Sequence, residues 1–337
     1  MKKTDMPPTY KGIKPKVSLL MPMYNSEKYL ATALMSAVIQ TYQNLEIIVV
    51  DDGSVDASYE IATKILSQFA GESKIVKQAN SGEASADNLA FSLSSGDFVI
   101  VLNSDDLLHP DCIESCLDTL LENPKASVAY PDWDLIDSDG KLIKRVTTSE
   151  YAFESLVGSF TCLPGPGALI RKSSIRKPWL RDPSYRYIND FRMWLDISLV
   201  SEFVRVPSFL AAFRVHGSQQ GAKKSAKAQA EELVRCHRTF FSENIDEPRV
   251  RAAEKEALAM AHYFATLQSL NTNGFWGIKH SLKSIFTIFR RSENSLRRRS
   301  FVALVLGALG PAGGIVFRAL LGIRSFVLEI KPRKRNQ

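Results

Sequence analysis

Acidic residues directly follow two predicted strands of this 337-residue chain. The run Phe98–Leu102 is aliphatic and β-branched, as expected of a strand buried on both faces, and the polar stretch Asn103–Asp106 follows it. The run Leu45–Val50 ends in the same way, at Asp51 and Asp52. Ligands of open α/β sheets bind beyond the carboxyl ends of the strands, where carboxylates can hold a divalent metal and its phosphate ligand. Both stretches are therefore candidate sites, although a solvated acidic turn also explains each one taken alone.

These acids need a sheet to bring them together, and the order of the predicted elements supplies one. The predicted strands are Val17–Met21, Leu45–Val50, Lys74–Lys77 and Phe98–Leu102, and the predicted helices are Tyr29–Ile39, Asp56–Phe69 and a segment from Ala86 to Leu93. Strands that alternate with helices indicate a mostly parallel α/β sheet wound by right-handed crossovers. Asn25 and Ser26 are expected to cap the first helix.

Composition favours a large, reduced, folded protein. A hydrophobic content of 45% allows an extensive core, so we expect one large domain with an appendage. The four cysteines are too scattered for a disulfide framework or a zinc site and are predicted to be buried thiols; they are Cys112, Cys116, Cys162 and Cys236. The polar start, Met1–Lys16, has no secretory signal pattern, which fits a cytoplasmic location.

Charge divides the chain near residue 222. From Lys223 onward there are 21 Lys and Arg against 9 Asp and Glu, whereas residues 1–222 carry 22 against 27. The mildly acidic first part lacks the basic and aromatic interleaving of a nucleic-acid site, so we expect no nucleic-acid partner. We predict one large domain over 1–222 and a basic helical extension over 223–337, a candidate for association with a membrane.

That extension contains a short apolar run between basic clusters. Helices are predicted over 226–241, 249–270 and 275–289. The apolar run 301–317 has 17 residues and is interrupted by glycines and Pro311, so it is at the lower limit for a membrane-spanning helix. Basic residues before it, at 297–299, and after it, at 331–335, favour an interfacial segment on anionic lipid. A helical subdomain with a solvated basic face is the alternative.

The motifs in this order resemble the family 2 glycosyltransferases. They read PMYN, QTYQNLEIIVVDDGSVD, NSGEASADNLA, GDFVIVLNSDD and YPDWDLIDSDGK, within a similarity that runs from about Val17 to Gln220. The resemblance implies an A-type nucleotide-sugar fold, Rossmann-like with a mostly parallel sheet between helices. It also implies a nucleoside-diphosphate sugar donor, a divalent metal (Mn²⁺ or Mg²⁺) and inversion at the anomeric carbon.

For the donor, the resemblance places Pro22 and Tyr24 against the nucleotide base and Asp51 at the uracil edge, with Asp52 beside it. An aromatic ring offers a stacking face, and a carboxylate accepts the imide hydrogen. Asn80 belongs to the loop that the family uses near the donor. A half-buried core tyrosine is the structural alternative for Tyr24.

For the metal, Asn103, Ser104 and Asp105 stand where the family has Asp-x-Asp. The resemblance assigns metal contact mainly to the second acid, so Asp105 remains a ligand, while Asn103 and Ser104 can hydrogen-bond the donor. In the loop NSGEASADNLA, Asp87 stands where the family usually carries arginine.

The resemblance divides the domain over 1–222 into a nucleotide-sugar half at about 17–130 and an acceptor half at about 131–222. Gly165 and Gly167 indicate special dihedral angles or close approach to a ligand. The helix predicted over Tyr187–Val200, with Asn189 as its cap, carries Asp190. The resemblance makes Asp190 the general base, although an acid favoured by the helix dipole is the alternative. Trp194 is a candidate wall of the sugar pocket or a core residue.

An edge-like strand is predicted from Phe209, and it ends near Arg214 and His216, where the family often has Arg-x-His. An imidazole there can complete the metal shell, and an arginine can offset the charge of the diphosphate.

We therefore expect a metal-dependent inverting glycosyltransferase, using a UDP-sugar and a polysaccharide or lipid-linked acceptor, peripheral on the cytoplasmic face of the membrane. A catalytically silent nucleotide-sugar-binding or scaffold protein is the rival. A nucleotidyltransferase is a third reading, but PMYNSEKYL lacks a glycine-rich phosphate loop.

Overall fold

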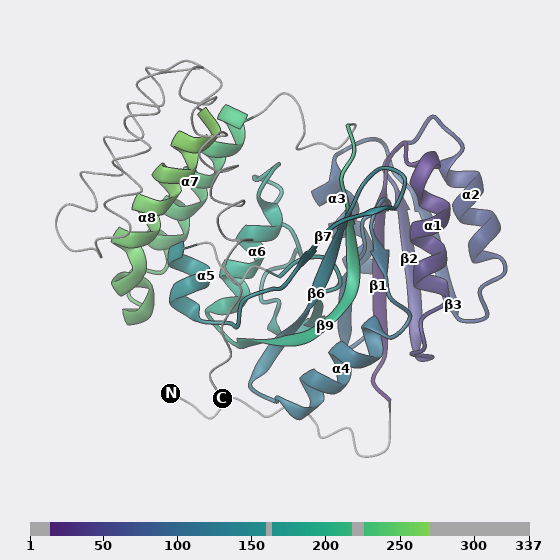
Figure 1. Cartoon of the computed structure of the whole chain (residues 1–337), viewed down its shortest axis with the longest axis horizontal. Coiled ribbons are helices and arrows are strands. Elements are labelled where there is room, and N and C mark those ends of the chain that lie inside the picture. Colours follow the sequence, from purple (N-terminus) through teal and green to yellow (C-terminus); the bar gives the residue numbers. More distant parts are fainter. Residues whose placement is uncertain (1–13, 160–163, 218–225, 270–337) are drawn as a thin grey trace, which may run out of the picture. The chain divides into compact units, whose positions relative to one another are not determined.

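The computed structural model describes residues 14–159, 164–217 and 226–269 (Figure 1). The chain divides into two compact units. The first comprises residues 1–156 and 161–219, and the second comprises 157–160 and 220–337. All residues of the predicted donor, metal and base sites belong to the first unit.

Within the described residues, the first unit is built on one nine-stranded sheet. Its strands are β1 Val17–Met23, β2 Leu45–Asp51, β3 Glu72–Lys77, β4 Phe98–Val101, β5 Leu107–Leu108, β6 Ala126–Ile136, β7 Leu142–Val146, β8 Leu169–Arg171 and β9 Glu202–Arg214. The helices are α1 Glu27–Val38, α2 Ser58–Leu66, α3 Glu83–Leu93, α4 Cys112–Glu122, α5 Phe153–Ser159, α6 Asn189–Ser198, α7 Ala226–Glu243 and α8 Pro248–Ser269, with a 3₁₀ turn at Lys172–Ser174. The strand order is β3-β2-β1-β4-β8-β6-β9-β5, and β7 pairs with β6.

The first four strands form the predicted parallel half of the sheet. β1 pairs in parallel with both β2 and β4, and β2 pairs in parallel with β3. The order therefore reverses at β1, which is where open α/β sheets bind their ligands. The other half is mixed, because β8 lies antiparallel between β4 and β6 while β6 and β9 are parallel.

Both faces of the sheet are buried at β1, β2 and β4, which explains the apolar runs in these strands. Leu19 and Met21 of β1 pack with α1, α2 and α4 in one core cluster. Leu20, between them, points into a second cluster with residues of α3 and α6. A strand with helices on both sides buries successive residues on opposite faces, so it needs no polar alternation. The acids after β2 and β4 consequently stand out as the polar ends of apolar strands.

Three sequence predictions need correction. β9 begins at Glu202 and is paired on both sides, with β6 and with β5, so it is not an edge strand. Ser26 is the N-cap of α1 but its side chain makes no cap hydrogen bond, and the Asn25 Oδ1 accepts from the Val55 N–H at 2.9 Å. Contacts to a neighbouring loop satisfy these side chains instead. Asn189 is the first residue of α6, whose N-cap is Ile188.

The two glycines predicted to be special are required by protein packing. A Cβ on Gly165 would lie 2.5 Å from the Trp133 indole nitrogen. Gly167 has φ +83° and packs against Cys112 and Ala211. Both are therefore sites of close approach within the protein core. The predicted buried thiols are seen at Cys112, Cys116 and Cys236, and Cys162 lies outside the described residues.

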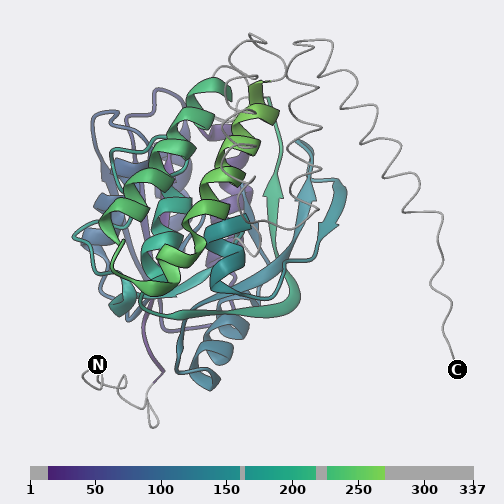
Figure 2. The same cartoon turned by 90° about the vertical axis from the view of Figure 1, so that its left-hand side faces the viewer.

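The second unit contains α7 and α8, which lie side by side (Figure 2). Small residues allow close contact, and Ala230, Val234 and Ala261 form a buried cluster. Across the part of the chain that the structure describes, no helix combines the length and apolar character needed to cross a bilayer. The helix predicted over 275–289 and the apolar run 301–317 lie outside the described residues.

Candidate functional site

Two aspartates end β2, and their side chains have different environments. Asp52 accepts hydrogen bonds from the Gln78 side chain and from the backbone N–H groups of Ser81 and Gly82, at 2.7 to 2.8 Å. Its carboxylate therefore holds the loop that leads into α3. Asp51 is fully buried, and only its Oδ1 accepts a bond, from the Ser54 N–H at 2.9 Å. The Asp51 Oδ2 has no hydrogen-bond partner among the described residues.

The turn after β4 brings Asp105 to His216. The Asp105 Oδ2 lies 2.9 Å from the His216 Nε2. The contact exists because β5 pairs with the end of β9, so the chain beyond β9 passes beside the turn. Arg214 strengthens the junction by donating from its Nε to the Asp105 carbonyl at 2.9 Å. These three predicted site residues are therefore neighbours.

The next residue, Asp106, is a buried acid that supports this turn. It is 2% exposed and accepts a bond from the Arg214 backbone N–H at 2.9 Å. Burial raises the pKa of Asp106 to about 8, and the nearby Asp105 charge adds to the effect. Asn103 donates to the Asp106 carboxyl at 3.3 Å, so the amide that replaces the first acid of the motif supports Asp106.

The remaining predicted donor residues lie near the ends of β1 and β3. Tyr24 is 49% exposed directly after β1, so its ring is available for stacking. Ser104 lies in the turn after β4 and contacts the segment after β1, because its Oγ lies 2.7 Å from the Ser26 Oγ. Asn80 is exposed in the loop before α3. Pro22 is buried within β1, opposite Val50, away from the exposed ring.

Asp190 lies in the first turn of α6, at the exposed end of the helix. Its Oδ1 accepts a bond from the Phe191 N–H at 2.7 Å. Trp194, one turn later, is 6% exposed and packs edge-on against Phe203 in the second core cluster. The prediction that Trp194 walls a sugar pocket finds no support in this packing.

Sequence reasoning missed a group of charged residues on α3. Asp87 is fully buried and pairs with Arg181, whose Nε lies 3.2 Å from the Asp87 Oδ2. Burial raises the pKa of Asp87 to about 6, because it outweighs the effect of Arg181. Burial also raises the pKa of Glu83 to about 7, with contributions from the charges of Asp87, Asp190 and Asp105. Glu83 therefore lies within electrostatic reach of both the predicted metal ligand and the predicted base.

One signal for this group was present in the sequence. Glu83 and Asp87 are four residues apart in a helix of mostly small residues, so they share one face. Arg181, however, is 94 residues from Asp87, and nothing local indicates that the two meet.

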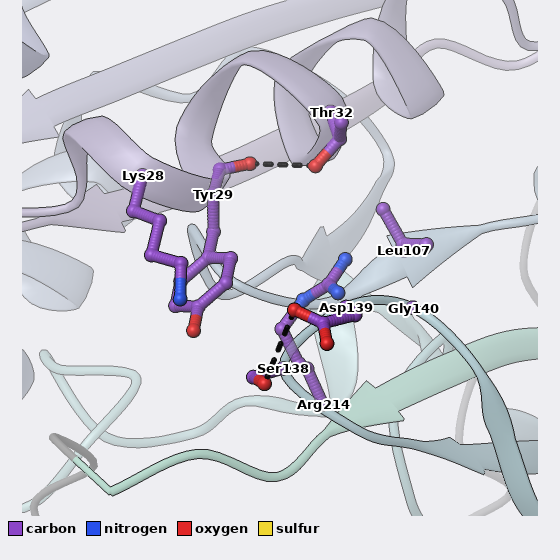
Figure 3. A pocket seen from close by; sticks show the side chains of 8 residues that line it. All are labelled: Lys28, Tyr29, Thr32, Leu107, Ser138, Asp139, Gly140 and Arg214. Carbon is purple, nitrogen blue, oxygen red and sulfur yellow. Dashed lines mark hydrogen bonds between the residues drawn. The ribbon is translucent and has the colours of Figure 1, made fainter.

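A pocket of about 310 Å³ is lined by residues of α1, by Leu107 just after the Asp105 turn, and by Arg214 of β9. Figure 3 shows Lys28 and Tyr29 of α1 facing Arg214 and the turn between β6 and β7 across this space. The Tyr29 ring is 4.6 Å from the His216 ring and 5.0 Å from the Arg214 guanidinium. The Tyr29 ring thus packs against both side chains that contact Asp105, which are Arg214 at the end of β9 and His216 just beyond it.

The chemistry of the pair formed by Asp105 and His216 suits a divalent cation that a phosphate ligand helps to bind. Magnesium-type ions are commonly held by one or two protein groups together with substrate phosphates and water. Among the described residues there is no cluster of three or more His, Cys, Asp or Glu that could hold an ion by itself. Such a metal would therefore need the donor to complete its shell.

Comparisons with known proteins agree with this architecture. The model of the family described as "Glycosyl transferase family 2" matches residues 18–179. An uncharacterized glycosyltransferase of Haemophilus influenzae is 33% identical over 187 residues, which cover 54% of this chain and 71% of that protein. The chondroitin synthase of Escherichia coli is 30% identical over 213 residues, or 62% of this chain and 30% of that enzyme.

The fold is found in solved structures as well. The crystal structure of S. aureus TarS 1-349 in complex with UDP-GlcNAc superposes with a TM-score of 0.64 at 16% identity, covering 89% of this chain and 92% of that one. This likeness shows the A-type glycosyltransferase fold, in agreement with the sheet order and its reversal at β1. The sequence relatives and the family match together establish that the chain is a member of glycosyl transferase family 2.

Proposed function

We propose that this glycosyltransferase moves a sugar from a UDP-sugar to a polysaccharide or lipid-linked acceptor, with inversion at the anomeric carbon. The observation that carries the proposal is the 2.9 Å contact between Asp105 and His216, which come from separate motifs 111 residues apart. Their meeting beyond the carboxyl end of β4 supports a diphosphate site there.

Asp51 and Tyr24 support a uracil nucleotide. The unpaired, buried Oδ2 of Asp51 is an acceptor suited to the imide N–H of uracil. The exposed Tyr24 ring nearby offers a stacking face. The complex of TarS with UDP-GlcNAc shows that a protein of this fold binds such a donor, which supports the choice of nucleotide.

Asp105 and His216 are the residues we propose to hold Mn²⁺ or Mg²⁺. Arg214 lies beside them and offsets negative charge at the diphosphate. When bound, the ion neutralises charge on the leaving diphosphate. The role of Asn103 and Ser104 is then to position the turn and to hydrogen-bond the donor.

Asp190 is the residue we propose as general base. The acceptor hydroxyl oxygen attacks the anomeric carbon, the bond from that carbon to the diphosphate oxygen breaks, and the hydroxyl proton passes to the Asp190 carboxylate. The exposure of Asp190 at the end of α6 supports access by an acceptor. The diphosphate leaves with the electron pair of the broken bond.

The acceptor and the location follow from the relatives and the charge. Chondroitin synthase is a polysaccharide-forming relative, which supports a glycan acceptor. The basic part from Lys223 onward supports attachment to anionic lipid at the cytoplasmic membrane face, where a lipid-linked acceptor would be available. Flotation of the whole chain with anionic liposomes, but not with neutral ones, is the expected result. Absence of flotation with either would exclude the attachment.

A catalytically silent nucleotide-sugar-binding protein is the second candidate. Three positions favour it, because the family that the chain resembles carries an aspartate where Asn103 stands, usually an arginine where Asp87 stands, and a glutamate where Asn189 stands, directly before the base. The two candidates differ in turnover rather than in binding.

The test is a screen of UDP-sugars and GDP-mannose, each with and without Mn²⁺ or Mg²⁺, that measures binding by calorimetry and donor hydrolysis by release of the nucleoside diphosphate. Metal-dependent binding of a UDP-sugar together with slow hydrolysis is expected of the enzyme. Binding with neither hydrolysis nor transfer to any added glycan acceptor favours the silent protein. Binding of GDP-mannose alone contradicts the uracil assignment.

A further inference from the structure

A buried ion pair joins α3 to the segment before α6. The Arg181 Nε lies 3.2 Å from the Asp87 Oδ2, and the two side chains are 9% and 0% exposed. Pairs of this kind are expensive to bury unless the remaining polar atoms are also satisfied. The partners available to those remaining polar atoms therefore indicate the function of the pair.

The position of Arg181 is fixed by the residue that follows Asp87. The Asn88 Oδ1 accepts from the backbone N–H groups of Leu180 and Arg181, at 2.9 and 2.8 Å, and its Nδ2 donates to the Arg181 carbonyl at 2.8 Å. Three hydrogen bonds from one side chain hold this backbone against α3. The guanidinium is consequently positioned by the fold.

Each partner of the pair nevertheless retains an unused polar atom. Neither the Arg181 Nη1 nor the Asp87 Oδ1 has a hydrogen-bond partner within the described part of the chain, and both atoms are shielded from solvent. An unsatisfied buried polar group destabilises the folded state. The pair thus lacks one acceptor for Arg181 and one donor for Asp87.

The surrounding charge restricts what can satisfy both atoms. Glu83 lies one turn before Asp87, and the charges of Glu83 and Asp190 both act on this group. Glu83 and Asp87 both act on Arg181, and Asp190 acts on both of these carboxylates, so the negative charge here disfavours a further anion such as phosphate. A cation would leave the Arg181 N–H unpaired. A hydroxyl group accepts one hydrogen bond and donates another, so it satisfies both atoms.

We infer that Arg181 and Asp87 together bind a hydroxyl group of the transferred sugar, and so contribute to the choice of donor. The inference rests on the proposed function, which brings a sugar to the space between Asp105 and Asp190. Both atoms are shielded from bulk solvent, so binding requires a local shift of the side chains that cover them. The hydrogen bonds from Arg181 and Asp87 are made to the sugar and not to the nucleotide.

The test compares UDP with UDP-glucose, UDP-galactose and UDP-N-acetylglucosamine by calorimetry, in the presence of Mn²⁺. Asp87→Asn keeps the shape of the side chain, and Arg181→Lys keeps the charge. Each is expected to lower the affinity for the best-bound UDP-sugar about tenfold, the loss of one charge-assisted hydrogen bond, while the affinity for UDP stays within about twofold. A deoxy analogue of that sugar that lacks the recognised hydroxyl should bind the wild type and Asp87→Asn equally.

The matched control is Asp132→Asn, at a buried pair with Arg205 elsewhere in the sheet. It should lower the melting temperature without changing the ratio of UDP-sugar to UDP affinity. The inference is overturned if Asp87→Asn and Arg181→Lys keep the wild-type ratio, or if the control changes it equally. It is also overturned by a donor complex in which only water bridges the two atoms. Failure of the wild type to bind any UDP compound instead refutes the proposed function, and the inference with it.

Discussion

Two Arg–Asp pairs of the first unit, Asp87 with Arg181 and Asp132 with Arg205, differ in how completely their atoms are bonded. Asp132 accepts bonds from both the Thr148 backbone and hydroxyl and from the Arg205 guanidinium, so both of its oxygens are used. Asp87 receives one bond, from Arg181, and its second oxygen is unpaired among the described residues. Both aspartates are buried, so the exposure of the carboxylate alone does not distinguish their roles.

The pKa directions of the two aspartates report the same contrast. Burial acts to raise the pKa of Asp132, but the hydrogen bonds from Arg205 and Thr148 outweigh it and lower that pKa. For Asp87 burial prevails over Arg181, and the pKa rises to about 6. A fully bonded pair stabilises the fold, whereas an incompletely bonded pair retains atoms for a ligand. The predictions below test whether this distinction holds.

The largest effect is expected on turnover, from a substitution of Asp190, whose charge acts on Glu83 and Asp87. Asp190→Asn keeps the shape but removes the basicity, so kcat should fall on the order of 10² to 10⁴ with donor affinity unchanged. Thr148→Val, at the fully bonded pair, should leave kcat unchanged. The measurement is steady-state transfer with the donor found in the screen. Near wild-type transfer by Asp190→Asn would remove Asp190 from the mechanism.

A large effect on stability is expected at the fully bonded pair. Among the described residues, Asp132→Ala leaves Arg205 with the exposed Glu150 and the Thr148 hydroxyl as partners, so the free energy of unfolding should fall by about 3 kcal/mol. Asp87→Ala should cost less, because Glu83 and Asp190 remain near Arg181. Urea unfolding of both variants compares the two losses. Equal losses would mean that the pairs do not differ in structural role.

Asp51 and Asp52 provide a second instance of the contrast. Asp51→Asn should weaken UDP binding about tenfold, with or without metal, because it alters the unpaired oxygen proposed to face the base. Asp52→Asn replaces one of the two oxygens that hold the α3 loop by a donor, so it should mainly lower the melting temperature. Calorimetry with UDP and thermal unfolding distinguish the two. The reverse ranking on UDP would contradict the assignment.

The smallest effect concerns the pH dependence of stability. The pKa of Glu83 is about 7 in the folded chain, above its ordinary value of 4.5, so the folded state binds the proton more tightly. The contribution of Glu83 to the free energy of unfolding is fully present below pH 4.5 and is lost as the pH rises towards 7. Glu83→Gln should therefore flatten the decline in stability between pH 4.5 and 7. Asp132 has a lowered pKa, and its contribution is lost in the opposite direction, as the pH falls below 3.8.

The local elements could be predicted from the sequence because they depend on short-range pattern. Apolar runs that end in acids marked β2 and β4, and the alternation of strands with helices indicated the parallel half of the sheet. Among the site residues, Asp51 and Asp105 could be named because each follows a buried strand directly. Most element boundaries moved by only a few residues, but β9 begins at Glu202 and not at Phe209. Asn25 and Ser26 do not bond the first turn of α1 with their side chains, because a neighbouring loop supplies other partners, and Asn189 lies one residue inside α6.

Only the tertiary structure decided which side chains meet. His216 reaches Asp105 through the pairing of β5 with β9, and Arg181 reaches Asp87 across 94 residues through the bonds of Asn88. No local pattern encodes either meeting. The same is true of the bonding that separates Asp51 from Asp52 and Asp87 from Asp132, because whether a buried oxygen is satisfied depends on partners that the fold brings from elsewhere in the chain.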